Sequence, residues 1–427
     1  MRNNIVHFGA DEQHYEIREI VEVAYKIKEI GKKEIIWENI GDPVIKGEKI
    51  PDWLKDIVSK ATRDDITYAY SPSKGVDATR KFLAEQNGKI TSEDIIFFNG
   101  LGEAINKIYG YLNRNARVLG PNPAYPTHSS SEATHAGSSH LTYELDPDNE
   151  WNPNLEEIEN KVKYNPNISA ILVINPDNPT GAVFSRETLE GIVNIAKKYN
   201  LFVLFDEIYE KLTFDIKDHI LLKDIIGDVC GIAMKGLSKE VPWPGSRCGW
   251  IEIYNQDKDE EFAKFINSIY FSKMLEVCST TLPQTVLPEI YKAPEFNKYL
   301  SERISKYKKN SDIVEEILGP VKGLKFVRPK GAYYLTVLID DFLLVEDFFK
   351  DLKDKNLEKF VREISIGKKI DKKFCYYLLA TTGICTVPLS GFNSPLPGLR
   401  MTLLEDDEQK FRKILEEIVF AFENIKK

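Results

Sequence analysis

Short apolar runs alternate with amphipathic, helix-period segments through the middle of the chain, from about residue 65 to residue 290. In segment 187–198, for example, apolar residues recur every three or four positions, as in a helix with one buried face. Near-continuous apolar strands separated by helices are typical of a mostly parallel sheet that helices cover on both faces. We therefore expect an α/β fold with strands at Ile95–Phe98, Arg117–Leu119, Ala170–Ile174, Leu201–Phe205, Gly231–Met234 and Gly249–Ile253.

Polar or glycine-bearing sequence follows nearly all of these runs. In mostly parallel sheets, ligands bind beyond the carboxyl ends of the strands. Segments that come after different strands can therefore meet at one edge of the sheet. This pattern predicts one shared site, built from Asn99-Gly100, Gly120-Pro121, Asn175-Pro176, Asp206-Glu207 and Gly236-Leu237-Ser238-Lys239.

The portion from residue 293 to residue 427 has a different pattern. Long charged helices at Phe296–Leu318 and Asp407–Ile425 flank apolar runs at Tyr333–Ile339 and Cys385–Leu389. A chain of 427 residues is long enough for two domains. We expect a large domain over residues 61–292. Residues 1–60 and 293–427 would form a smaller α/β domain with an N-terminal arm.

Composition disfavours several classes of protein. The net charge of −9 argues against binding to a nucleic-acid backbone. No run approaches ~18 apolar residues, the start of the chain is polar, and the six histidines do not cluster at metal-ligand spacing. The five cysteines are scattered, as reduced thiols are in a cytosolic protein. We predict a cytoplasmic protein without a membrane, nucleic-acid or metal partner.

Lys239 is the lysine whose surroundings most favour chemistry. It lies in a turn of small residues after an apolar run, and Pro242, Pro244 and Gly245 follow in an irregular loop that leads to Arg247. An amine that attacks carbonyl groups must be partly desolvated, which lowers its pKa and raises its nucleophilicity. The nearby arginine can hold a phosphate with two hydrogen bonds. A surface cation is the commoner role of a lysine, but this setting also fits a Schiff-base lysine.

Asp206 and Asn178 follow two of the expected strands. A buried carboxylate at the end of a strand is costly unless it meets a cation or hydrogen-bond donors. Asp206 suits a helix N-cap and, equally, an anion that pairs with a pyridinium nitrogen, beside which Tyr209 can donate to a phenolic oxygen. Asn178 lies in a segment rich in proline and asparagine that first indicates a rigid turn. The same rigidity can fix its amide against a ligand.

Three further features are weak when each is taken alone. Gly100-Leu101-Gly102 separates an apolar run from a helix, so backbone N–H groups and the helix dipole can hold a phosphate there. Tyr125, in the loop after residues 120–123, can stack on an aromatic ring or simply pack. Arg400 lies on an expected strand, where it can clamp a carboxylate or face solvent.

Taken in order, these motifs resemble those of class I/II aminotransferases of pyridoxal-phosphate (PLP) fold type I. The similarity runs nearly end to end. It is strongest in NPDNPTG at 175–181, DEIYE at 206–210, and GLSK at 236–239 followed by PGSRCGW at 244–250. This combination would rarely occur by chance. The resemblance implies PLP as cofactor, a large domain with a mostly parallel sheet, and a smaller α/β domain.

The resemblance also implies roles for the residues that carry chemistry. Lys239 would form the Schiff base with PLP and shuttle the proton, and Asp206 would pair with the pyridine nitrogen. Asn178 and Tyr209 would hold the phenolic oxygen, while Tyr125 would stack on the ring.

Phosphate and substrate contacts are implied in the same way. The phosphate would lie against Leu101, Gly102, Ser238 and Arg247. Tyr70 matches the tyrosine that reaches the neighbouring subunit's phosphate, which implies a homodimer. Gly41 and Arg400, with Asn178, match the residues that bind the substrate carboxylate.

Two departures from the family pattern affect the loop around the lysine. Pro242-Trp243-Pro244 replaces small or aliphatic residues, so this loop is expected to have another shape. Gly236 stands where some relatives have a serine that binds phosphate, so one hydroxyl contact is expected to be missing.

Within the family, the chain looks most like the alanine aminotransferases. Tyr15-Glu16-Ile17-Arg18 resembles the arm that closes over their active site, and segment 383–393 with Leu399-Arg400 resembles their C-terminal part. Tyr15 and Arg18 could instead simply lie on an amphipathic N-terminal helix.

We therefore expect an aminotransferase that moves an amino group from an L-amino acid, alanine above all, to a 2-oxo acid such as 2-oxoglutarate in a ping-pong cycle. Aspartate, aromatic or broad specificity are the alternatives, and the same scaffold supports β-elimination or C–S lyase chemistry. A PLP-binding regulator fits less well, because the chain has no room for a DNA-binding domain before Gly41 and no basic patch.

Overall fold

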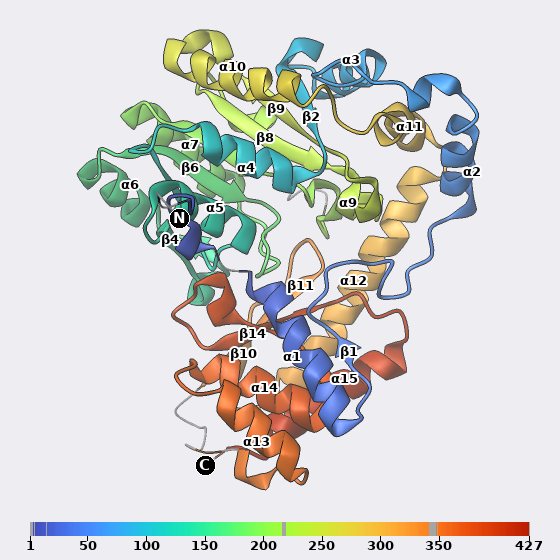
Figure 1. The fold of residues 1–427 in the computed structure, drawn as a ribbon, viewed down its shortest axis with the longest axis vertical. Helices are drawn as coiled ribbons and strands as arrows, with labels where there is room; N and C mark the ends of the chain where they lie inside the picture. The colour runs from blue at the N-terminus through green and yellow to red at the C-terminus, as the bar shows by residue number, and fades with distance from the viewer. Residues whose placement is uncertain are drawn as a thin grey trace.

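The computed structural model describes residues 3, 5–13, 15–215, 219–340, 347 and 349–426. All six strands expected from the apolar runs lie in one eight-stranded sheet (Figure 1). Five adjacent strands, from β8 to β4, are parallel, while β9 runs antiparallel to β2 and β8, and β5 to β4. The strand order is β2 (Ile95–Phe98), β9 (Gly249–Tyr254), β8 (Gly231–Gly236), β7 (Phe202–Asp206), β6 (Ile168–Ile174), β3 (Arg117–Asn122), β4 (Leu141–Asp146) and β5 (Asn152–Pro153).

Helices bury both faces of this sheet, which confirms the predicted α/β class. Successive residues of β6 point to opposite sides. Leu172 packs in the cluster with α4 (Leu101–Tyr111) and α10 (Glu260–Leu275), whereas Val173 packs in the cluster with α6 (Leu155–Tyr164) and α7 (Arg186–Tyr199). Because both faces are apolar, the strand sequence shows no alternation of polar and apolar residues.

Strand β4 was not among the expected strands, although it belongs to the same sheet. Its second half alternates buried and exposed side chains, with Tyr143 and Leu145 buried and Glu144 exposed. A half-exposed strand near the sheet edge therefore lacks the continuous apolar run that marks the central strands.

The C-terminal part forms a four-stranded antiparallel sheet with its own core (Figure 1). The sheet order is β10 (Leu324–Phe326), β11 (Tyr334–Ile339), β14 (Gly398–Thr402) and β13 (Val387–Pro388). The helices of this part are α12 (Phe296–Leu318), α13 (Lys355–Ile364), α14 (Ile370–Thr382) and α15 (Glu408–Glu423).

The N-terminal segment joins this C-terminal part. Helix α1 (Glu16–Gly31) packs into its core, and β1 (Ile36–Trp37) pairs in parallel with β12 (Ile384–Cys385). Helices α2 (Asp52–Ala61), α3 (Asp77–Asn87) and α11 (Thr281–Lys292) lie together beside the large sheet (Figure 1). The division into domains at residues 61–292 stays a prediction.

No helix within the described ranges is both long and apolar enough to cross a membrane.

Candidate active site

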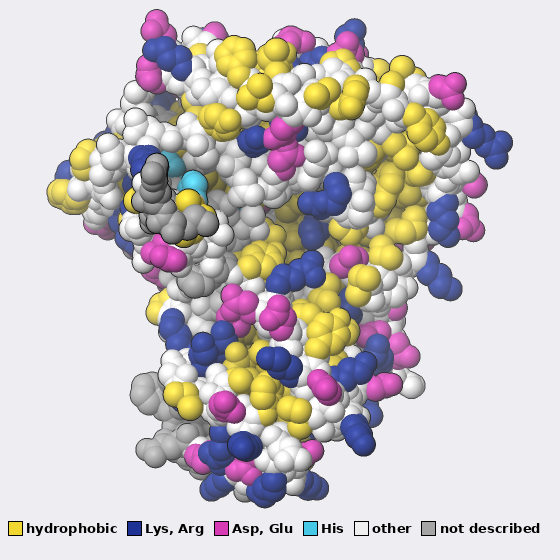
Figure 2. Space-filling view, in the orientation of Figure 1, with side chains coloured by type: hydrophobic (Ala, Val, Ile, Leu, Met, Phe, Trp, Pro, Cys, Tyr) yellow, Lys and Arg dark blue, Asp and Glu magenta, His cyan; other side chains and the backbone are white. Residues whose placement is uncertain are grey.

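A cavity of about 610 Å³ opens at the carboxyl ends of the parallel strands. It is lined by every candidate residue named from the sequence except Tyr70, which is 83% exposed. Asp206 ends β7, Asn178 and Tyr125 follow β6 and β3, and Lys239 follows β8. The strand ends thus bring together side chains that are far apart in the sequence. Figure 2 shows Lys and Arg side chains beside a hollow between the two parts of the molecule.

Lys239 lies in the short helix α9 (Leu237–Glu240) and is half-buried. Its Nζ donates a hydrogen bond to the Gly41 carbonyl oxygen at 3.1 Å. The Tyr333 hydroxyl donates to the same oxygen at 3.0 Å. The ammonium also lies 5.9 Å from the centre of the Tyr209 ring. The lysine amine is therefore aimed into the cavity, next to the Gly41 segment.

The Asp206 carboxylate is 3% exposed and is held from two sides. The Ile208 backbone N–H donates to its Oδ1 at 3.1 Å, and His128 Nε2 lies 3.1 Å from its Oδ2. His128, on α5 (Pro126–Ala136), was missed by the sequence reasoning. The available signal was its position three residues after Tyr125, at the start of a helix that follows β3.

A pair of tyrosine hydroxyls lies between the lysine and Arg400. Tyr209 donates to the Tyr334 hydroxyl at 3.1 Å. Burial and the neighbouring Tyr334 raise the pKa of Tyr209 well above its usual value. Burial would also raise the pKa of Tyr334, but the positive charges of Lys239 and Arg400, together with hydrogen bonds to Tyr209 and Tyr333, lower it. Tyr334 was missed because its apolar run indicated a core strand, which β11 also is.

Gly41 allows the chain to pass close to these tyrosines. A Cβ at residue 41 would collide with the Tyr334 hydroxyl. Any larger residue would therefore displace either the tyrosine or the segment that holds the Lys239 amine.

Arg400 is a buried cation. It is 1% exposed, and no carboxylate in the described part of the chain forms an ion pair with it. Its Nη1 donates to Asn178 Oδ1 at 3.3 Å, its Nη2 to the Asn39 carbonyl oxygen, and its Nε has no hydrogen-bond partner there. Burying an uncompensated charge is costly. This arrangement favours the binding of an anion to Arg400.

The opposite end of the cavity is formed by the start of α4 and by Arg247. Gly100 adopts φ +83°, and a Cβ there would strike the Arg247 guanidinium. A Cβ at Gly102 would meet nothing within 4 Å, so the helix start faces open space. Backbone N–H groups at a helix start, beside an arginine, favour a phosphate.

Steric crowding explains why residue 236 is a glycine. A Cβ there would lie 2.8 Å from the Cys248 carbonyl oxygen and 3.2 Å from the Gly249 Cα, on the neighbouring strand β9. A serine could not enter without moving the backbone. The close packing of β8 against β9 therefore explains the glycine at position 236, whereas the loss of a phosphate contact stays a prediction.

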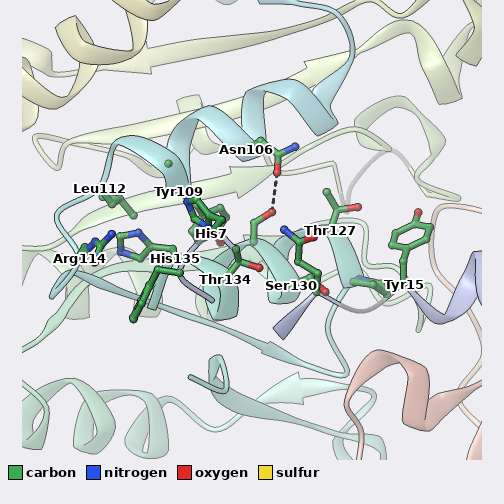
Figure 3. A pocket seen from close by; sticks show the side chains of 15 residues that line it. His7, Tyr15, Asn106, Tyr109, Leu112, Arg114, Thr127, Ser130, Thr134 and His135 are labelled. Carbon is green, nitrogen blue, oxygen red and sulfur yellow. Dashed lines mark hydrogen bonds between the residues drawn. The ribbon is translucent and has the colours of Figure 1, made fainter. Parts of the chain in front are cut away.

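The N-terminal arm closes one side of the cavity. Tyr15, just before α1, has its hydroxyl 3.3 Å from the Tyr125 hydroxyl, and Arg18 also lines the cavity. A second cavity of about 610 Å³ lies on the outer side of Tyr15, where His7, Phe8 and Gln13 face helices α4 and α5 (Figure 3). Tyr15 and Thr127 line both cavities, so they form the wall between them.

The arm docks through contacts that small residues permit. Gly9 adopts φ +76°, and a Cβ there would strike the Thr134 backbone. A Cβ at Gly137 would strike the Phe8 ring, over which Arg114 lies at 4.7 Å. The position of Tyr15 next to Tyr125 is therefore supported by the packing of residues 8 and 9 against α5 and its end, in addition to helix α1.

The fold is that of PLP-dependent transferases of fold type I. The chain belongs to the class I and II aminotransferases, because the model of that family matches residues 34–418. These enzymes use PLP, and the site fits it: an amine, a buried carboxylate held by His128 and an open helix start face one cavity.

Relatives of known sequence and structure agree with this assignment. An uncharacterized aminotransferase of Methanocaldococcus jannaschii is 53% identical over 421 residues, 97% of each chain. The glutamate-pyruvate aminotransferase AlaA of Escherichia coli K12 is 29% identical over 334 residues, 76% of this chain and 80% of that protein. The solved alanine aminotransferase of Pyrococcus furiosus superposes with a TM-score of 0.83 at 28% identity and covers 98% of each chain.

Proposed function

We propose that this aminotransferase takes L-alanine as its amino donor and 2-oxoglutarate as its acceptor, in a ping-pong cycle. The carrying observation is the Tyr15–Tyr125 hydroxyl contact of 3.3 Å, which closes the cavity above the site and favours a small donor side chain. Arg18, at the same wall, carries a positive charge suited to the second carboxylate of 2-oxoglutarate. Two relatives near 29% identity bear the names alanine or glutamate-pyruvate aminotransferase.

In this proposal the residues of the cavity bind the cofactor, the substrate or both. Lys239 would bond the PLP aldehyde, and Asp206, oriented by His128, would pair with the ring nitrogen. Asn178 and Tyr209 would hold the phenolic oxygen. Tyr125 would stack on the ring, and Leu101, Gly102, Ser238 and Arg247 would bind the phosphate.

Substrate binding follows from the uncompensated charge of Arg400. Its guanidinium, with Asn178 and the Gly41 backbone, would hold the α-carboxylate. A fixed carboxylate sets which bond at Cα lies across the cofactor plane, and orientation of this kind selects the bond that breaks.

Lys239 is the group placed to move the proton. Bound PLP acts as an electron sink that weakens the Cα–H bond. The Lys239 amine faces this cavity, where it would remove the Cα proton as a general base and return it as a general acid. Its hydrogen bond to the Gly41 oxygen keeps it next to the substrate carboxylate site.

An absorbance titration tests the proposed specificity. The purified protein with added PLP is expected to show a Schiff-base band that bleaches with L-alanine and returns with 2-oxoglutarate. A band that responds to aspartate or to aromatic amino acids instead would overturn the alanine assignment. Release of pyruvate from a β-substituted amino acid without a 2-oxo acid would indicate C–S lyase chemistry.

We further propose a homodimer in which Tyr70 completes the partner's phosphate site. Tyr70 and its neighbour in sequence Tyr68 are exposed, as are Phe271 and Leu275 near the end of α10. Apolar patches of this kind mark protein interfaces.

Sedimentation of the protein is expected to give the mass of two chains. Mixing unfolded Lys239→Ala and Tyr70→Ala chains and refolding them together should yield activity that neither variant shows alone, because one site of the mixed dimer has both residues intact. A monomer, or no recovery on mixing, contradicts the shared site.

A cytoplasmic location belongs to the same proposal. All five cysteines are free, and three of them are buried. Free buried thiols suit a reducing compartment.

A further inference from the structure

We propose that Arg303 is a positioning residue that fixes the Lys239 backbone relative to the Gly41–Glu48 segment. This proposal rests on the roles proposed above for Lys239 and Gly41. Arg303 lies on α12, the long helix that runs from the large sheet to the four-stranded sheet (Figure 1). The cavity does not include it, so it would act through other residues.

The guanidinium of Arg303 binds the end of the helix that carries the lysine. Its Nη1 donates to the carbonyl oxygens of Lys239 and Glu240, at 2.9 Å and 2.7 Å. These are the last carbonyls of α9, where a positive charge is also favoured by the helix dipole. Arg303 is 3% exposed, so water does not replace these bonds.

The same guanidinium is paired with Glu48. Arg303 Nε lies 2.5 Å from Glu48 Oε1, and the Tyr299 hydroxyl donates to the same oxygen at 2.9 Å. Burial alone would raise the pKa of Glu48, but Arg303 and Lys306 outweigh burial and lower it, so the carboxylate stays charged.

Glu48 ends a short segment that begins at Gly41. The segment is folded on itself, since the Glu48 N–H donates to the Pro43 carbonyl oxygen at 2.9 Å and the Lys46 N–H to that of Asp42 at 3.1 Å. At its other end the Gly41 oxygen accepts from the Lys239 amine. Both ends of the segment are therefore tied to Lys239, at one end through its side chain and at the other through Arg303.

This closed set of contacts has a consequence for catalysis. The Lys239 amine must leave the Gly41 oxygen to bond the cofactor, whereas the contact of Arg303 with Glu48 still links the segment to α9. A small displacement of a reacting group can cost about a hundredfold in rate. Arg303 would thus keep Lys239 at a fixed position relative to Gly41, which belongs to the proposed site of the substrate carboxylate, while the lysine amine moves.

The test compares Arg303→Lys with Lys306→Met. A lysine at 303 keeps the charge but lacks the fork that reaches two carbonyls and the carboxylate at once. Lys306 also contacts Glu48, at 3.2 Å, but within the described ranges no hydrogen bond or ion pair joins it to α9, so its loss is the matched control. We expect Arg303→Lys to lower kcat roughly 10- to 100-fold, with a smaller change in KM, and Lys306→Met to leave kcat within about twofold.

Hydrogen exchange on the cofactor-free proteins gives a readout independent of activity. Faster exchange in peptides covering 237–247 and 41–48 in Arg303→Lys, but not in Lys306→Met, supports the proposal. Equal exchange and equal kcat in the two variants would overturn it. If Arg303→Lys does not fold, hydrogen exchange of the same two peptides is measured in Glu48→Gln. Faster exchange there supports the proposal, and unchanged exchange contradicts it. Because these exchange data need no cofactor, they remain decisive even if wild-type protein forms no Schiff base, which would refute the proposed function instead.

Discussion

Replacing Lys239 by alanine is expected to abolish transamination, lowering kcat by roughly 10⁴-fold or more, as the loss of a residue that serves as both nucleophile and base does. The side chain is the amine aimed into the cavity beside Gly41. Without it, added PLP should bind without a Schiff-base band, and borohydride should fix no cofactor to the chain. Absorbance and mass spectrometry of the reduced protein measure both effects.

Two controls separate chemistry from folding in this experiment. Lys264→Ala removes an exposed lysine on α10 and should leave the band and the rate unchanged. A small primary amine added to Lys239→Ala should restore part of the rate, since it can enter the space left by the side chain and accept the proton. Substantial activity of Lys239→Ala without added amine would refute the role of Lys239.

The sequence was sufficient for the parts of the site that lie next to strand ends. Lys239, Asp206 and Asn178 each follow a continuous apolar run, and the topology of a parallel sheet then requires that they meet. The strand β4 escaped the same reasoning because its side chains are buried only on alternate positions.

Residues that act by supporting others could not be found in this way. His128 and Asp206 are 78 positions apart, and nothing in either local sequence announces their contact. Tyr334 was hidden in an apolar strand, and Arg303 in a charged helix whose face toward α9 is set only by packing. Their function depends on tertiary neighbours, which periodicity does not encode.

The second large effect is expected at Asp206. Asp206→Asn keeps the shape of the side chain and an oxygen for His128, but a neutral amide cannot stabilise a protonated ring nitrogen. We expect kcat to fall about a hundredfold or more, the scale on which a preorganised electrostatic contact acts.

The Schiff-base band of Asp206→Asn should persist, because no contact joins the Lys239 amine to Asp206 among the described residues. Capture of the cofactor and cleavage of the Cα–H bond would then separate: the band forms normally, while exchange of the alanine α-proton with deuterated solvent slows in step with kcat. His128→Gln is the graded control, since it loosens the carboxylate without removing its charge, and its loss of rate should be smaller. If Asp206→Asn retained wild-type α-proton exchange, the carboxylate would not be the partner of the ring nitrogen, and the buried Asp206–His128 pair would have to be explained as structural alone.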